Sequence, residues 1–166
     1  MYEIKIAKLF SQYQQYFDIF SSCNNNFKII ESNKTTDHRR CGICPKCAFV
    51  YTTLRPFLTD EDVQNIFGQE LYENKNLIPL YKELLGIDGI KPFECVGTNE
   101  EVIYAMYLQY EKIKNNSLIP PIMELFKNEI LPTLSANDIS NLEKKLFTLY
   151  TDETNIPEIF QKTLAE

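Results

Sequence analysis

Three cysteines stand at strict three-residue spacing in the segment CGICPKC, which spans residues 41 to 47. Cys41, Cys44 and Cys47 are preceded by Cys23, which lies upstream of a polar stretch. Four thiolates are a common ligand set for tetrahedral zinc, with Zn–S distances of about 2.3 Å. The two-residue spacers allow one tight turn and the start of a helix to supply three of the ligands. Because four cysteines leave no coordination position open, the sequence predicts a closed, structural zinc site.

Three other interpretations of the cysteines remain open at this stage. His38, the single histidine of the chain, could replace Cys23 as the fourth ligand. An iron–sulfur cluster uses the same thiolate ligands. The cysteines could also be buried as small hydrophobic side chains without a metal. Their close spacing beside Arg39 and Arg40, in a polar stretch, favours metal binding over this last interpretation.

The segment KPFECVGTNEEV, residues 91 to 102, contains the second group of reactive side chains. Lys91, Glu94 and Cys95 are expected to lie in one loop, directly before the start of a helix. Backbone N–H groups at a helix start bind anions, and a nearby lysine or helix N-terminus lowers the pKa of a thiol. These three residues are therefore candidate catalytic residues, with Glu94 and Cys95 able to transfer protons. The alternative is a solvated Lys91–Glu94 pair, with Phe93 and Cys95 packed inward.

Helices are the elements predicted to position these groups. Hydrophobic periodicity predicts a first helix over residues 3 to 17, with one apolar face. The apolar face consists of Ile6, Leu9, Phe10, Tyr13 and Phe17. A buried helix is expected to follow the cysteines and to end near Pro56. Further helices are predicted over NLIPLYKELLG, which ends at Gly86, and from Thr98 to about Ile113.

Capping residues indicate where several of these helices begin and end. Three pairs have the spacing of a capping box: Thr59 and Asp62, Thr98 and Glu101, and Ser135 and Asp138. Gly68 and Gly86 stand where C-terminal glycines belong, and Pro157 suits the first turn of a last helix. Strand signals are weak, and FKII at residues 27 to 30 is the best candidate.

The length of 166 residues allows one domain with a core of its own. We expect a mainly α fold with little or no β structure, in a single domain over residues 1–166. Within it, residues 19–47 form the zinc-knuckle loop, 86–98 the candidate active-site loop and 117–166 a helical tail. Arg55 is expected to form a salt bridge at a helix end.

Charge and composition narrow the classes of partner and location. The net charge is −6 and the pI is near 4.9, which argues against nucleic acid as the main partner. No apolar run approaches the roughly 18 residues of a membrane span. Charges and amides interrupt the first residues, unlike a signal peptide. We therefore expect a cytoplasmic protein, in a reducing compartment where clustered cysteines more often bind metal than form disulfides.

Three successive motifs resemble those of bacterial UDP-N-acetylmuramoyl-L-alanyl-L-glutamate epimerases. They are SSCNNNFK (21–28), CGICPKCAFVYTTLRPFL (41–58) and LYKELLGIDGIKPFECVGTNEEV (80–102), in the same order over roughly residues 5 to 110. The cysteine knuckle also resembles that of 7-cyano-7-deazaguanine synthases, which lack a KPFECVG segment. The combination of the knuckle with KPFECVG is what makes the first resemblance specific.

The resemblance implies an enzyme that uses ATP and Mg²⁺ to invert the terminal L-Glu of UDP-MurNAc-L-Ala-L-Glu to D-Glu, in peptidoglycan precursor synthesis. The ATP-binding part of this family lies upstream of the residues present here, so the chain resembles the C-terminal part. A separate ATP-binding subunit or an N-terminal domain would then supply the nucleotide site, and the chain is not expected to be active alone. Two alternatives are a non-catalytic, zinc-stabilised helical binding module and another ATP-dependent amide- or ligase-type enzyme that shares the zinc knuckle.

Overall fold

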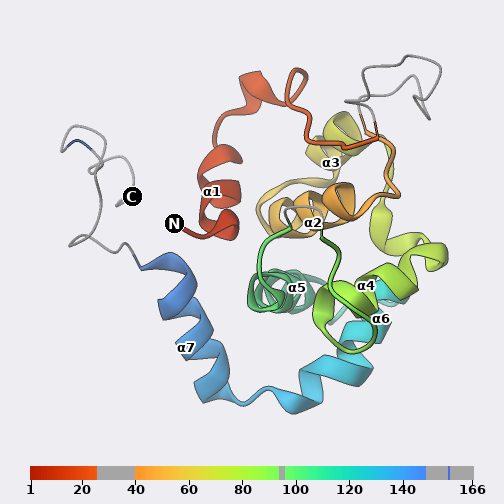
Figure 1. Cartoon of the computed structure of the whole chain (residues 1–166), viewed down its shortest axis with the longest axis vertical. Coiled ribbons are helices and arrows are strands. Elements are labelled where there is room, and N and C mark those ends of the chain that lie inside the picture. The colour runs from red at the N-terminus through yellow and green to blue at the C-terminus, as the bar shows by residue number, and fades with distance from the viewer. Residues whose placement is uncertain (26–39, 94–95, 149–156, 158–166) are drawn as a thin grey trace.

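The computed structural model describes residues 1–25, 40–93, 96–148 and 157 (Figure 1). This described part is mainly α-helical and contains no β-strand, which confirms the predicted fold class. The α-helices are α1 (Glu3–Phe10), α2 (Pro45–Leu54), α3 (Asp60–Phe67), α4 (Ile78–Leu85), α5 (Asn99–Ile113), α6 (Pro121–Leu125) and α7 (Ala136–Phe147). Short helical turns connect them: η1 (Gln14–Tyr16), η3 (Arg55–Phe57), η4 (Leu71–Glu73), η5 (Lys75–Leu77), the π-helical η6 (Phe126–Ile130) and η7 (Leu131–Thr133).

Helix α2 lies in the middle of the fold and packs against α1, α4 and α5 (Figure 1). Its sequence is apolar nearly all the way round, as a helix enclosed by others must be. The ring of Tyr51 in α2 meets the ring of Tyr72 edge-on, with centroids 4.9 Å apart. On its other side Tyr51 meets Phe67 at the end of α3, with centroids 5.1 Å apart. The core therefore forms around the helix that directly follows the cysteines.

The helix ends follow the predicted capping residues. In each of the three capping boxes, the hydroxyl accepts the N–H of the acidic residue, and the carboxylate accepts the N–H of the cap residue. Gly68 ends α3 with φ 69° and Gly86 ends α4 with φ 73°. Both glycines adopt the left-handed conformation that closes a helix without a Cβ clash. These predicted starts and ends are confirmed.

The predicted helix over residues 3 to 17 is wrong in its second half, because α1 ends at Phe10. The face turned toward the core also differs from the predicted one. Ile4 and Ala7 are buried, whereas Ile6 is 46% exposed. The apolar periodicity of this segment predicts one continuous helical stripe, but α1 covers only its first part.

An aromatic cluster explains where α1 ends. The ring centroid of Phe10 lies 5.5 Å from that of Phe17 and 4.7 Å from that of Phe20. The chain therefore turns back after Phe10, so that Phe17 packs against the helix end instead of extending the helix. The Ser11 hydroxyl donates a hydrogen bond to the carbonyl of Lys8 at 2.7 Å, which satisfies one of the acceptors left open at a helix end.

The C-terminal helices belong to two packed clusters. Ile122, Met123 and Phe126, from α6 and the start of η6, are fully buried in the main core. Leu146 of α7 packs in a second cluster with Tyr104 of α5. Helix α7 contacts both α1 and α5 (Figure 1). The segment expected to be a helical tail thus contributes to the core through residues 121 to 126.

Two of the sequence expectations fall outside the described residues. These are the candidate strand FKII at residues 27 to 30 and nearly all of the last helix expected near Pro157. Among the helices that are described, none combines the length and apolar character needed to cross a membrane.

Candidate functional site

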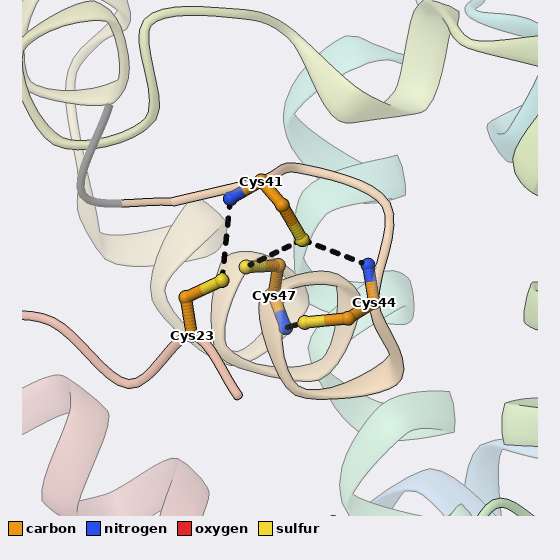
Figure 2. A group of neighbouring side chains, drawn as sticks. All are labelled: Cys23, Cys41, Cys44 and Cys47. Carbon is orange, nitrogen blue, oxygen red and sulfur yellow. Dashed lines mark hydrogen bonds between the residues drawn. The ribbon is translucent and has the colours of Figure 1, made fainter. Parts of the chain in front are cut away.

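The structure brings Cys23, Cys41, Cys44 and Cys47 together at the N-terminal end of α2 (Figure 2). Cys41 and Cys44 lie in the turn before the helix, Cys47 lies in its first turn, and Cys23 approaches from the N-terminal segment. All four sulfur atoms lie within 4.8 Å of one another. All four side chains are buried. The cysteines form a cluster of their own, separate from the two apolar clusters.

The sulfur geometry fits a tetrahedral metal ion. Zn–S distances of about 2.3 Å in a tetrahedron place neighbouring sulfurs about 3.8 Å apart. The Sγ atoms of Cys41 and Cys47 are 3.9 Å apart. All four cysteines are free thiols, and 3.9 Å is far longer than the S–S bond of a disulfide, about 2.05 Å. The cluster can therefore form the predicted four-cysteine knuckle.

The local sequence explains why the chain turns so tightly here. Gly42 has φ 67°, a conformation that L side chains rarely adopt, and a Cβ at this position would overlap the side-chain amide of Gln69. Pro45 occupies the first turn of α2, where its missing N–H costs nothing. Cys44 is the N-cap of this helix. Its sulfur thus faces the N–H groups at the start of α2, where negative charge is stabilised.

Hydrogen bonds from N–H groups point at three of the four sulfurs. Backbone N–H groups donate from Cys41 to Cys23 Sγ at 3.3 Å, from Cys44 to Cys41 Sγ at 3.3 Å, and from Cys47 to Cys44 Sγ at 3.4 Å. The side-chain amide of Asn25 donates to Cys41 Sγ at 3.4 Å. Donors of this kind orient metal ligands and stabilise thiolates.

Burial and mutual contact shift the pKa values of the clustered thiols in different directions. The hydrogen bond from Cys47 lowers the pKa of Cys44 to about 4. The same contact with Cys44, together with burial, raises the pKa of Cys47, and burial raises the pKa of Cys41. In the absence of a cation, four adjacent buried sulfurs cannot all ionise. A divalent metal supplies the charge that lets them do so.

The alternative metal ligand and the candidate catalytic pair lie outside the described residues. They are His38, Glu94 and Cys95. Cys23 lies within coordination reach of the other three cysteines, so the four-cysteine set is complete without the histidine. The iron–sulfur alternative requires the same four ligands.

The described part of the 86–98 loop carries exposed apolar side chains. Lys91 is half-buried, Ile90 is 89% exposed and Phe93 is fully exposed. The alternative in which Phe93 packs inward is therefore wrong for this residue. The catalytic roles of Lys91 and of the two residues outside the described part stay predictions.

The end of this loop is anchored on α2 and α5. A Cβ on Gly97 would overlap the ring of Phe49 and the carboxylate of Glu101. Glu101 accepts hydrogen bonds from the N–H and the hydroxyl of Thr98, at 2.7 and 3.1 Å, and from the N–H of Ile4 at 3.2 Å. Because Phe49 and Cys47 lie on the same helix, α2 supports both the cysteine cluster and the end of the candidate active-site loop.

Arg55 forms ion pairs, as predicted, at the end of α2. Its Nη2 lies 2.6 Å from Asp60 Oδ1, and its Nε and Nη2 each lie 3.2 Å from a different carboxylate oxygen of Glu70. Burial, with a smaller contribution from neighbouring Glu73, raises the pKa of Glu70 to about 7. This pair lies at the opposite end of α2 from the cysteines.

Sequence reasoning assigned no contact to Asn25 and no structural role to Arg40. Asn25 bonds to a cysteine sulfur, and the side chain of Arg40 bonds to the segment before Cys23. The available signal was position alone, since each residue lies one or two places from a cysteine. Nothing in their types distinguishes them from the polar residues of the surrounding loop.

The four clustered cysteines and the candidate active-site loop both fall within the range matched by one protein family. The family model described as the MurL C-terminal domain matches residues 19–136. The chain belongs to this family. The range matched by the MurL C-terminal domain includes all four clustered cysteines, the whole 86–98 loop and helices α2 to α6.

Individual relatives agree with the MurL assignment. The chain is 46% identical over 110 residues to the UDP-N-acetyl-alpha-D-muramoyl-L-alanyl-L-glutamate epimerase of a Micromonospora species. The matched region covers 66% of the chain and 24% of that protein. It is 36% identical over 137 residues to the protein of the same name from Xanthomonas oryzae pv. oryzae. Here the matched region covers 82% of the chain and 30% of that protein. The chain thus spans about a quarter to a third of the length of these relatives. No solved structure matches it.

Proposed function

We propose that the chain is the zinc-bearing C-terminal part of an ATP-dependent epimerase, which converts the terminal L-Glu of UDP-MurNAc-L-Ala-L-Glu to D-Glu. One observation carries the proposal: the chain is 36% to 46% identical to relatives named as this epimerase. The matched family range contains both the cysteine cluster and the KPFECVG segment. The proposed partners are this substrate and an ATP-binding part, either an N-terminal domain or a separate subunit.

The proposed reaction needs a more acidic α-proton. The hydrogen on a carbon that bears a carboxylate is very weakly acidic, and ATP with Mg²⁺ would supply activation of that carboxylate by adenylation. We assign proton removal and return, on opposite faces of the carbon, to Glu94 and Cys95. Lys91 would hold the adjacent negative charge and lower the pKa of the thiol. Hydrolysis of the activated carboxylate would then release the D-Glu product.

We assign the metal of the four-cysteine site as Zn²⁺ with a structural role. Cys23, Cys41, Cys44 and Cys47 would occupy all four positions of a tetrahedral ion and leave none for substrate. The ion would hold the N-terminal segment against the start of α2. We also propose a cytoplasmic location, because a four-thiol site persists in a reducing compartment.

A chimera tests the proposed reaction. This chain replaces the matched C-terminal part of the Xanthomonas oryzae relative, and the product is incubated with ATP, Mg²⁺ and UDP-MurNAc-L-Ala-L-Glu in D₂O. We expect deuterium at the α-carbon of glutamate and accumulation of D-Glu. Both Glu94→Gln and Cys95→Ala should abolish accumulation of D-Glu, whereas Glu111→Gln, an exposed residue paired with Lys114, should not.

Three outcomes would contradict the proposal. Normal epimerisation by Glu94→Gln and Cys95→Ala would remove those residues from the reaction. Consumption of ATP with a new amide product and no α-proton exchange would favour the ligase-type alternative. A folded, metal-loaded chimera without either activity would favour the non-catalytic binding module.

A further inference from the structure

The four cysteine ligands reach the metal centre in two different ways. Cys41, Cys44 and Cys47 belong to one short segment, whose own turn and N–H···S bonds hold them together. Cys23 comes from a separate segment, and its sulfur receives one described hydrogen bond from the knuckle, the backbone N–H of Cys41. The segment that carries Cys23 has a further contact, which reaches it from the residue before Cys41.

Arg40 makes that contact from the position directly before Cys41. Its Nη2 donates a hydrogen bond to the carbonyl of Phe20 at 2.8 Å, and its Nη1 lies 3.5 Å from the Ser22 hydroxyl oxygen. Its guanidinium carbon lies 4.3 Å from the centre of the Phe20 ring. Phe20 and Ser22 lie three positions and one position before Cys23. A side chain adjacent to one ligand thus holds the backbone adjacent to the other.

The same guanidinium is fixed from the opposite side by α3. Arg40 Nε donates to the carbonyl of Ile66 at 3.1 Å, and its guanidinium carbon lies 4.8 Å from the centre of the Phe67 ring. A cation is favoured at a helix C-terminus, where carbonyl groups point outward, and against aromatic faces. Arg40 is only 3% exposed. Its planar fork therefore has a defined orientation that a flexible lysine would not reproduce.

We propose that Arg40 is a positioning residue that delivers Cys23 to the metal centre. The inference rests on the proposed metal site. It divides the four ligands into a local set, Cys41, Cys44 and Cys47, and one remote ligand, Cys23. Loss of Arg40 would free Cys23 while the local set of three cysteines still binds the ion. The site would then change from a closed four-thiolate centre to one with an exchangeable position.

Cysteine-specific labelling tests the inference on the intact chain. Wild type, Arg40→Met, Arg40→Lys and Arg55→Met are loaded with Zn²⁺, treated with iodoacetamide and mapped by mass spectrometry. Arg40→Met keeps an apolar stem and removes every donor. Arg55→Met is the matched control, because it removes a largely buried arginine at the far end of α2.

We expect the Cys23 thiol to label about 10-fold faster or more in Arg40→Met, in line with the usual effect of losing a contact around a metal ligand. Labelling of Cys41, Cys44 and Cys47 should stay close to wild type. Arg55→Met should leave all four protected. With Co²⁺ in place of Zn²⁺, the sulfur-to-metal absorption of Arg40→Met should fall in proportion to the loss of one thiolate of four.

Several results would overturn the inference. Equal protection of Cys23 in wild type and Arg40→Met, with an unchanged cobalt spectrum, would do so. Equal exposure of all four cysteines, or selective release of Cys23 in Arg55→Met, would show general destabilisation instead. If Arg40→Met does not fold, Arg40→Lys decides, and wild-type protection of Cys23 in that variant overturns the inference. A wild-type chain that binds no metal would refute the proposed zinc site as well.

Discussion

Gly97 lies so close to Phe49 that even a methyl group at position 97 would overlap the aromatic ring. Phe49 is almost fully buried in α2, two residues after Cys47. The end of the 86–98 loop is thus held against the helix that begins at the cysteine cluster. A change in the cluster can therefore reach the loop through one buried helix.

Gly97→Ala should destabilise the protein by about 1–3 kcal/mol, the usual cost of overpacking. The cost cannot be relieved by a small movement, because the Phe49 ring is enclosed and the Glu101 carboxylate is held by hydrogen bonds. Urea unfolding at equilibrium measures the loss. Gly68→Ala is the comparison: Gly68 has open space around it but φ 69°, so the loss in that variant comes from backbone strain and not from overlap. An undiminished free energy of unfolding in Gly97→Ala would contradict the close packing.

Zinc should be present at one ion per chain, and its removal should unfold the start of α2. The sulfur atoms of the four cysteines bond to one another and to backbone N–H groups of the knuckle. Without a cation, several of these buried thiols would keep their protons and crowd one another. Elemental analysis measures the metal, and a thiol assay before and after chelation should show about four additional reactive thiols. Iron, or no metal, would contradict the zinc assignment.

Glu101→Ala should destabilise the chain by about 2–4 kcal/mol, from a lost cap and a buried N–H left without an acceptor. Glu101 is 2% exposed, and it joins the start of α5 to the start of α1 through the N–H of Ile4. Thermal and urea unfolding measure the loss. Asp62→Ala breaks the same motif at an exposed helix start and should cost less. Equal losses in the two variants would show that the contact with α1 contributes nothing.

Stability should fall as the pH rises from about 5 to about 8. Burial raises the pKa of Glu70 from 4.5 to about 7, so the folded state binds this proton more tightly than the unfolded state. The stabilisation is therefore complete below about pH 4.5 and is lost as the pH passes through about 7. One pKa unit corresponds to about 1.4 kcal/mol, so a rise from 4.5 to about 7 amounts to roughly 3 kcal/mol at most, and solvent screening at this partly exposed carboxylate lowers that figure.

Glu70→Gln provides the comparison for this pH dependence. A glutamine cannot ionise, so the free energy of unfolding of the variant should change less between pH 5 and pH 8. Urea unfolding at several pH values gives both slopes. Parallel slopes for the variant and the wild type would show that Glu70 does not titrate in this range.

Features encoded within a few neighbouring residues could be predicted from the sequence alone. The capping boxes and the glycine stops each depend on bonds between residues no more than about four positions apart. The spacing of Cys41, Cys44 and Cys47 belongs to the same class, because one turn and one helix start place all three. The mainly α fold follows from these local signals together.

Only the tertiary structure decided which distant segments meet. The bond from Ile4 to Glu101 spans 97 positions, and the contacts of Arg40 join the segment before Cys23 to the end of α3. Likewise, the rings of Phe17 and Phe20 pack against Phe10 where α1 ends, and the periodicity of residues 3 to 17 does not show these contacts. Such contacts depend on how complete helices pack around α2. A local pattern shows that a residue is able to form them, but not which partner the fold supplies.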